Sequence, residues 1–263
     1  MRKRYVDTRH GQVHLREAGD AAAKPLLLIH WTPLSGRMFA GIAPYCVAAG
    51  YRVIAPDLLG YGRSDARPSE WTMAAWADNL AEVLDVLAVE EVAVVGGHNG
   101  ASVALELALG HPDRVSAVVL DGCPVLSDEL RAAFRGMVSS PLPQSPQVAI
   151  DRSVGLLAEY IPGYQPEGAQ LSLLWPAMID YLETDFVSSA AVAGLYDITQ
   201  RLPLLQHPAL LLGAERDPLA GTFDQAMASL CPKQHHMFPG HHPLHFADRQ
   251  AEYAQIVLGF VSG

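Results

Sequence analysis

The sequence predicts an α/β protein with a mainly parallel, eight-stranded sheet flanked by helices and interrupted by a helical insertion. Short apolar runs alternate along the chain with segments of helical periodicity, which is typical of strands joined by crossover helices. Most of these runs are apolar throughout, as expected of parallel strands covered on both faces. The alternation stops between Pro124 and Leu205, where eight prolines are spread through the sequence.

The expected strands follow in order along the chain. Residues 4–19 alternate polar and apolar side chains around Gly11, which predicts an antiparallel hairpin. A further strand is expected around His235 and His236. Continuous apolar runs predict the buried strands between them, at residues 26–29, 51–55, 92–95, 115–120 and 209–212.

Helices are expected between these strands. Residues 73–87 place apolar side chains on one helical face, whereas residues 101–109 are apolar nearly all round and should be covered on most sides. Residues 37–50 predict a helix that ends at a glycine. Residues 223–230 and 249–261 predict two more helices near the end of the chain.

The insertion divides the chain into a core, residues 1–123 and 206–263, and a lid, residues 124–205. Leucines and aromatic residues within the lid disfavour a poorly ordered loop. Active groups of parallel sheets collect at the carboxyl ends of the strands, so a lid over these ends would form an apolar pocket with a few hydroxyl groups. The residues expected to line this pocket are Tyr160, Trp175 and Tyr181.

Composition limits the classes of function. Of 263 residues, half are apolar and 17% are charged, which excludes a disordered chain. The formal net charge of −10 disfavours binding to nucleic acid, and no apolar run is long enough to span a membrane. Three widely spaced cysteines, Cys46, Cys123 and Cys231, predict buried free thiols in a reducing, cytoplasmic setting. No partner protein is indicated.

The most informative segment is Gly96-Gly97-His98-Asn99-Gly100, which joins a buried strand to a helix. It has the frame of a nucleophile elbow, in which small residues flank the central position because the chain turns sharply there. The central residue is expected at positive φ, which lifts its side chain out of the sheet. The centre is His98, where serine would be usual.

On these residues the chain resembles the α/β-hydrolase superfamily. Residues 28–33 resemble the His-Gly turn after the third strand, with Trp31 in place of the glycine. Residues 57–64 match the loop Asp-x-x-Gly-x-Gly-x-Ser. Residues 213–218 resemble the turn that carries the catalytic acid, and residues 240–243 resemble the Gly-His-x-Pro turn that carries the catalytic histidine. Their order is the family order, and the histidine-centred elbow resembles a subgroup of bacterial hydrolase-like proteins.

The resemblance implies a catalytic constellation of His98, Asp217 and His241. It also implies an oxyanion hole formed by the backbone N–H groups of Trp31 and Asn99.

Three further residues are candidates by the same resemblance. Asp121 ends the sixth strand, where some members of the superfamily place an acid. A shift of one residue would give the histidine role to His242. His30 is expected to support the oxyanion loop.

Three mechanisms remain open. His98 attacks an acyl carbon, after which His241, braced by Asp217, activates water. Alternatively His241 is a general base and His98 a hydrogen-bond donor, which fits hydrolysis, C–C cleavage or cofactor-free oxygenation equally. A metal site of these three residues, with His30 or His242 nearby, is the third.

The function predicted from the sequence is hydrolysis of a small or medium-sized, mostly apolar ester, lactone or related acyl compound, without metal or other cofactor. The alternatives are a non-hydrolytic enzyme that uses His241 as base and an inactive ligand-binding homologue.

Overall fold

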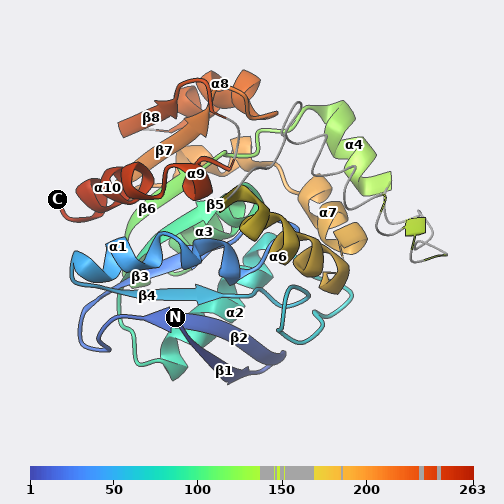
Figure 1. Ribbon diagram of the computed structural model, residues 1–263. Coiled ribbons are helices and arrows are strands. Elements are labelled where there is room, and N and C mark those ends of the chain that lie inside the picture. Colours follow the sequence, from blue (N-terminus) through green and yellow to red (C-terminus); the bar gives the residue numbers. More distant parts are fainter. Residues whose placement is uncertain are drawn as a thin grey trace.

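Eight strands form a single sheet in the order β1-β2-β4-β3-β5-β6-β7-β8 (Figure 1). β1 and β2 form an antiparallel hairpin, β2 pairs antiparallel with β4, and all remaining pairs are parallel. The expected fold class is therefore confirmed. The strands are β1 Arg2–Thr8, β2 Gly11–Ala18, β3 Lys24–Ile29, β4 Tyr51–Pro56, β5 Val92–Gly97, β6 Val115–Asp121, β7 Ala209–Ala214 and β8 Gln234–Phe238.

This computed structural model describes residues 1–136, 145, 147–148, 151, 169–184, 186–230, 234–241 and 244–263, with the backbone alone at 169–175 and 186–188. The α-helices are α1 Ala43–Ala48, α2 Met73–Val86, α3 Asn99–Gly110, α4 Asp128–Gly136, α6 Ala169–Glu183, α7 Phe186–Leu195, α8 Phe223–Ser229, α9 His245–Asp248 and α10 Gln250–Val261. Short 3₁₀ helices are η1 Gly36–Ala40, η2 Pro112–Arg114, η4 Ile198–Gln200, η5 Leu202–Leu204 and η6 Ala220–Thr222.

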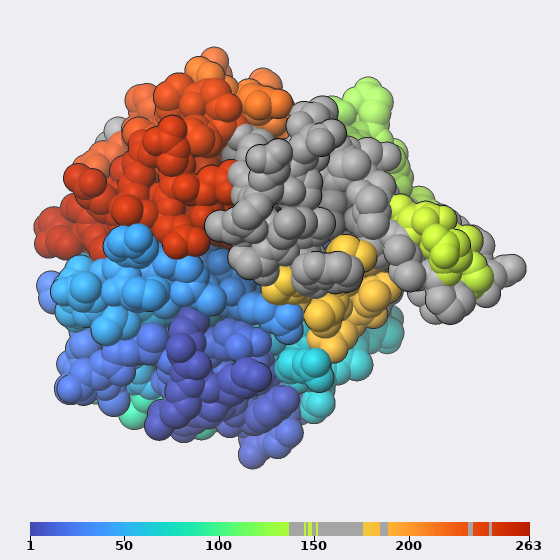
Figure 2. Space-filling view, viewed as in Figure 1, coloured from blue at the N-terminus to red at the C-terminus, as the bar shows by residue number. Residues whose placement is uncertain are grey.

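Two apolar layers cover the two faces of the sheet. α2 and α3 cover one face, and α1, α9 and α10 cover the other (Figure 1). Their buried side chains belong to the two layers. Neighbouring strand residues point to opposite layers, so Val94 packs in the first and Val95 in the second. This explains why the parallel strands are apolar at every position. α1 and α10 are far apart in sequence and lie side by side (Figure 2).

The prediction of a single helix over residues 37–50 is wrong. The segment forms η1 and then α1, with a break at Gly41 and Ile42. Pro44 lies in the first turn of α1, where its missing N–H costs no hydrogen bond, so that a new helix begins there. Gly50 ends the segment at a φ of 84°, as the glycine stop predicts.

In the described part of residues 124–205, the chain forms the helices α4, α6 and α7 and the short helices η4 and η5. α4 packs on α7, and the Arg135 guanidinium donates to the Gly194 carbonyl at 2.9 Å. No helix in the described ranges combines the length and apolar character of a membrane span. Cys46 and Cys123 are buried free thiols, and Cys231 lies outside the described residues.

Candidate active site

A sharp turn between β5 and α3 carries His98 at the carboxyl edge of the sheet. Its φ and ψ are 47° and −118°, which confirms the expected positive φ. The turn needs glycine at Gly96 and Gly100: a Cβ at Gly96 would lie 2.1 Å from the Gly100 oxygen, and a Cβ at Gly100 would lie 2.5 Å from the Ile29 oxygen. The His98 N–H donates to the Asp121 carbonyl at 2.7 Å, which ties the turn to β6.

The imidazole of His98 reaches the carboxylate that follows β7. Nε2 of His98 lies 2.9 Å from Oδ2 of Asp217, and the Leu219 N–H donates to Oδ1 at 2.7 Å. Burial by itself would raise the pKa of Asp217, but the charge and hydrogen bond of His98 outweigh it and lower the pKa. Asp217 is therefore an ionised acceptor, so Nε2 of His98 carries a proton and donates it to Oδ2.

Two neighbours fix the plane of the His98 ring. The indole of Trp31 stacks on it with a centroid distance of 4.1 Å and an interplanar angle of 18°. Gly97 makes room for the indole, because a Cβ there would overlap the indole nitrogen. Gly122, at a φ of 58°, faces the other side: its Cβ would lie 2.7 Å from Nε2 of His98 and 3.2 Å from Oδ2 of Asp217. The composition of the turn alone did not indicate these contacts.

The candidate oxyanion residues belong to two segments that are joined by hydrogen bonds. The Asn99 side chain donates to Oγ1 of Thr32 at 3.0 Å, and this hydroxyl also bonds the Tyr61 hydroxyl at 2.7 Å. The start of α3, with the Asn99 N–H, is thereby held against the turn after β3, which carries Trp31. Their role in binding an oxyanion stays a proposal.

His30 supports this turn through both ring nitrogens. The Leu58 N–H donates to Nε2 at 3.0 Å, so Nδ1 carries the proton and donates to the Trp31 carbonyl at 2.8 Å. Burial lowers the pKa of His30. A ring with both nitrogens occupied is suited to holding the loop rather than to reacting.

His241 does not meet the expected acid. It is partly buried, its carbonyl accepts the Arg216 N–H at 2.8 Å, and burial, Arg249 and His245 lower its pKa. Within the described ranges, no hydrogen bond joins it to Asp217, whose Oδ2 accepts from His98. The expected pairing of Asp217 with His241 is thus replaced by a pairing with His98. His242 lies outside the described residues.

Asp121 belongs to a second, fully buried pair. Its Oδ2 lies 3.1 Å from Nε2 of His245 and accepts the Tyr253 hydroxyl at 3.1 Å. His245 stacks on Phe238 with a centroid distance of 4.4 Å. In the structure His245 begins the separate helix α9 and holds the Asp121 side chain beneath the His98 turn.

The remaining candidates lie between residues 124 and 205 or concern a metal. Tyr181 is half-buried on α6. Tyr160 and the side chain of Trp175 lie outside the described part. Among the described side chains, no group of three His, Cys, Asp or Glu is placed to hold a metal ion.

Comparison with known proteins places this chain in a family. The model of the alpha/beta hydrolase fold matches residues 24–248. A haloalkane dehalogenase from Mycobacterium marinum is 27% identical over 241 residues, which cover 86% of this chain and 80% of the relative. A 2-hydroxymuconate semialdehyde hydrolase from Pseudomonas putida is 40% identical over 113 residues, which cover 42% of this chain and 40% of the relative.

Solved structures show the same fold along the whole chain. The enol-lactonase from Burkholderia xenovorans LB400 superposes with a TM-score of 0.86 at 17% identity, over 99% of this chain and 100% of that one. Epoxide hydrolase A from Mycobacterium thermoresistibile gives a TM-score of 0.79 at 24% identity, over 100% and 98% of the two chains. With a family model that spans most of its length, the chain belongs to the alpha/beta hydrolase fold family and is a hydrolase of that fold.

Proposed function

We propose that this chain hydrolyses a small or medium-sized, mostly apolar ester, lactone or related acyl compound, with His98 as catalytic imidazole and Asp217 as its acid. The observation that carries the proposal is the bond between Nε2 of His98 and Oδ2 of Asp217. A carboxylate bonded to one ring nitrogen fixes the tautomer and stabilises the imidazolium formed when the other nitrogen takes up a proton. The similarity to an enol-lactonase supports an acyl substrate.

The reaction that fits this pair is a direct displacement by water. Nδ1 of His98 takes a proton from water as the water oxygen attacks the acyl carbon. The oxyanion would be stabilised by the backbone N–H groups of Asn99 and Trp31. When the bond between the acyl carbon and the leaving oxygen breaks, the proton on Nδ1 passes to that oxygen, and the products are an acid and an alcohol. Asp217 stays ionised throughout.

A covalent route is the alternative for the same residue. Nδ1 of His98 would attack the acyl carbon and release the alkoxide, and water would then hydrolyse the acyl-imidazole. That route needs a second base for the water, the role expected of His241. Direct displacement is favoured, because Asp217 bonds His98 and, among the described residues, no hydrogen bond joins the His241 side chain to a carboxylate. For the same reason, a non-hydrolytic reaction with His241 as base gains no support.

The test compares three variants on a panel of short-chain nitrophenyl esters and lactones. His98→Ala and Asp217→Asn should each lower kcat by about a hundredfold or more, whereas His241→Ala should retain most of the activity. Circular dichroism verifies that each variant is folded. Full activity of His98→Ala, or its loss in His241→Ala alone, would overturn the proposal.

Mass spectrometry after rapid quench separates the two routes. No acyl adduct on His98 is expected during turnover of the wild-type chain. An adduct that forms and decays at the rate of turnover would instead assign the covalent route to the same residue.

A further inference from the structure

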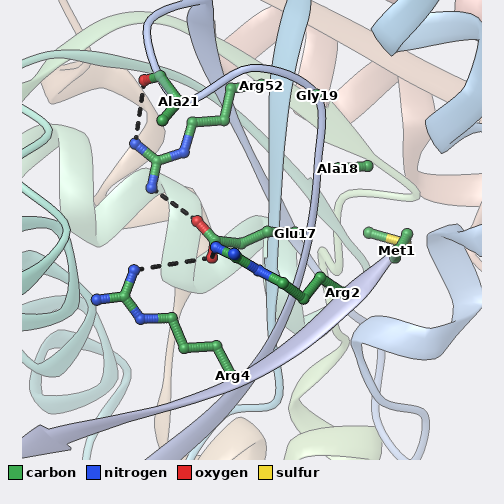
Figure 3. Close-up of a pocket in the computed structure, with 8 residues that line it drawn as sticks. All are labelled: Met1, Arg2, Arg4, Glu17, Ala18, Gly19, Ala21 and Arg52. Atoms are coloured by element: carbon green, nitrogen blue, oxygen red, sulfur yellow. Dashed lines mark hydrogen bonds and ion pairs between the residues drawn. The ribbon is translucent and has the colours of Figure 1, made fainter.

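Arg2, Arg4, Arg52 and Glu17 meet at one end of the sheet. They lie on the sheet face that, farther along the same strands, packs into the hydrophobic core. The strand register places Arg2 opposite Glu17 and Glu17 opposite Ile54. Side chains alternate along a strand, so Arg2, Arg4, Glu17 and Arg52 share one face. Figure 3 shows the three guanidinium groups around the Glu17 carboxylate. The same face continues into the apolar layer as Val6, Val13, Leu15 and Ile54.

The four charged residues surround a cavity of about 510 Å³, whose wall is completed by Met1, Ala18, Gly19 and Ala21. This volume lies within the range of small-molecule sites. Arg52 lies at the start of β4, whereas His98 follows the carboxyl end of β5, and both strands run parallel to β3. The cavity is therefore at the opposite end of the sheet from the candidate active site.

Two of the charged side chains that line the cavity are nearly buried. Those of Arg52 and Glu17 are only 9% and 8% exposed, and Nη2 of Arg52 donates to Oε1 of Glu17 at 2.7 Å. Nη1 of Arg52 reaches the Ala21 carbonyl at 3.5 Å. Ionised groups are rarely buried to this extent unless they are paired. The Glu17 carboxylate therefore holds the Arg52 guanidinium in one orientation, in the way that a second carboxylate orients the ligand of a metal ion.

The two remaining arginines form looser ion pairs with the same carboxylate. Their nitrogens approach Oε2 of Glu17 only to 3.5 Å for Arg2 and 3.8 Å for Arg4, and this oxygen is buried without a hydrogen-bond partner among the described residues. Three guanidinium groups against one carboxylate leave two positive charges at the cavity, in a chain whose formal net charge is −10. Guanidinium groups bind phosphate and carboxylate groups through paired N–H donors.

We infer that this cavity binds a small multivalent oxyanion, a phosphate or polycarboxylate group, through Arg2, Arg4 and Arg52. The arginines supply the donors and Glu17 holds Arg52 in place. The inference is independent of the proposed function, because no residue of the cavity belongs to the His98 site.

Isothermal titration calorimetry at constant ionic strength tests the inference, with inorganic phosphate and citrate as the two probes and chloride as the supporting anion. The variant Arg2→Gln/Arg4→Gln should raise the Kd of the preferred anion by about tenfold or more. Lys3→Gln is the control, since it removes one positive charge from β1 on the opposite face and should leave the Kd within about twofold.

The anion that binds more tightly distinguishes a phosphate site from a polycarboxylate site. His98→Ala should bind it as the wild type does, which separates this cavity from the catalytic site. Absence of binding by both anions to the wild-type chain would overturn the inference. So would an equal loss of affinity in Lys3→Gln, because the effect would then be one of general surface charge.

Discussion

His98 and Asp217 stand 119 positions apart in the chain and are joined by a 2.9 Å hydrogen bond between Nε2 and Oδ2. The contact brings the turn after β5 to the turn after β7 at the carboxyl edge of the sheet. His98 thereby occupies the sharp turn and also contacts the acid. The sequence pattern had assigned these two features to two different histidines, His98 and His241.

Replacement of Gly122 by alanine should disable this pair. The new Cβ would lie 2.5 Å from Cδ2 and 2.7 Å from Nε2 of His98, at a φ of 58° that L side chains rarely adopt. Because the ring must move away from Asp217, we expect kcat/KM on an acyl substrate to fall by about a hundredfold. Gly110→Ala is the control, since its Cβ meets no atom within 4 Å. Equal activity of the two variants would contradict the prediction.

Gly97 and Trp31 should be energetically coupled. Gly97→Ala places a Cβ on the indole of Trp31 and should lower the free energy of unfolding by about 1–3 kcal/mol. In a Trp31→Ala background the indole is gone, so the same change should cost much less. Urea denaturation of the four proteins gives the coupling energy, expected at about 1 kcal/mol or more. Strict additivity would show that the two residues do not compete for one space.

Asp180 should make the stability fall as pH rises. Burial raises its pKa to about 6, against the opposing effects of a hydrogen bond from Ser35 and the charge of Arg37. The folded chain therefore holds a proton that the unfolded chain releases near the ordinary aspartate pKa of 3.8. The contribution of Asp180 is fully present below that unfolded value and declines as pH rises through 6, by about 3 kcal/mol at most.

Urea denaturation of Asp180→Asn between pH 4 and pH 8 measures this contribution. The variant should lose the part of the pH dependence that falls between about 4 and 6. Glu183→Gln, on the same helix and more exposed, should keep most of it, since the Glu183 charge makes only a small contribution to the raised pKa. An unchanged pH profile in Asp180→Asn would assign the dependence to other groups.

Asp57 should be essential for folding of the loop that follows β4. It pairs with His14 at 2.8 Å and accepts the N–H groups of Gly36 at 2.9 Å and Arg63 at 3.0 Å. Burial alone would raise its pKa, but the His14 hydrogen bond and the Arg63 N–H lower it, so its contribution is present above the unfolded pKa and lost as pH falls through the lower folded value.

Removal of Asp57 leaves its buried donors unpaired. Asp57→Ala should reduce the free energy of unfolding by about 3–5 kcal/mol, and the exposed control Asp20→Ala by about 0.5 kcal/mol or less. Chemical denaturation at neutral pH compares the two. A small effect at Asp57 would show that the neighbouring donors find other acceptors.

Much of the fold could be predicted because it depends on local signals. Continuous apolar runs predicted the parallel strands, since strands covered on both faces require apolar residues throughout. The turn at His98 was predicted because its glycines are needed for the close approach of backbone atoms. The break near Pro44 was missed, since an apolar pattern does not reveal where a helix begins anew.

The sequence by itself determined the architecture and the residue at the sharp turn. Only the tertiary structure decided that Asp217 bonds His98 rather than His241, and that His245 pairs with Asp121 in the interior. The physical reason is that a hydrogen bond depends on the direction of a side chain to within tenths of an ångström. At His98 that direction results from the backbone angles of the turn and the stacked Trp31 ring, which no local pattern encodes.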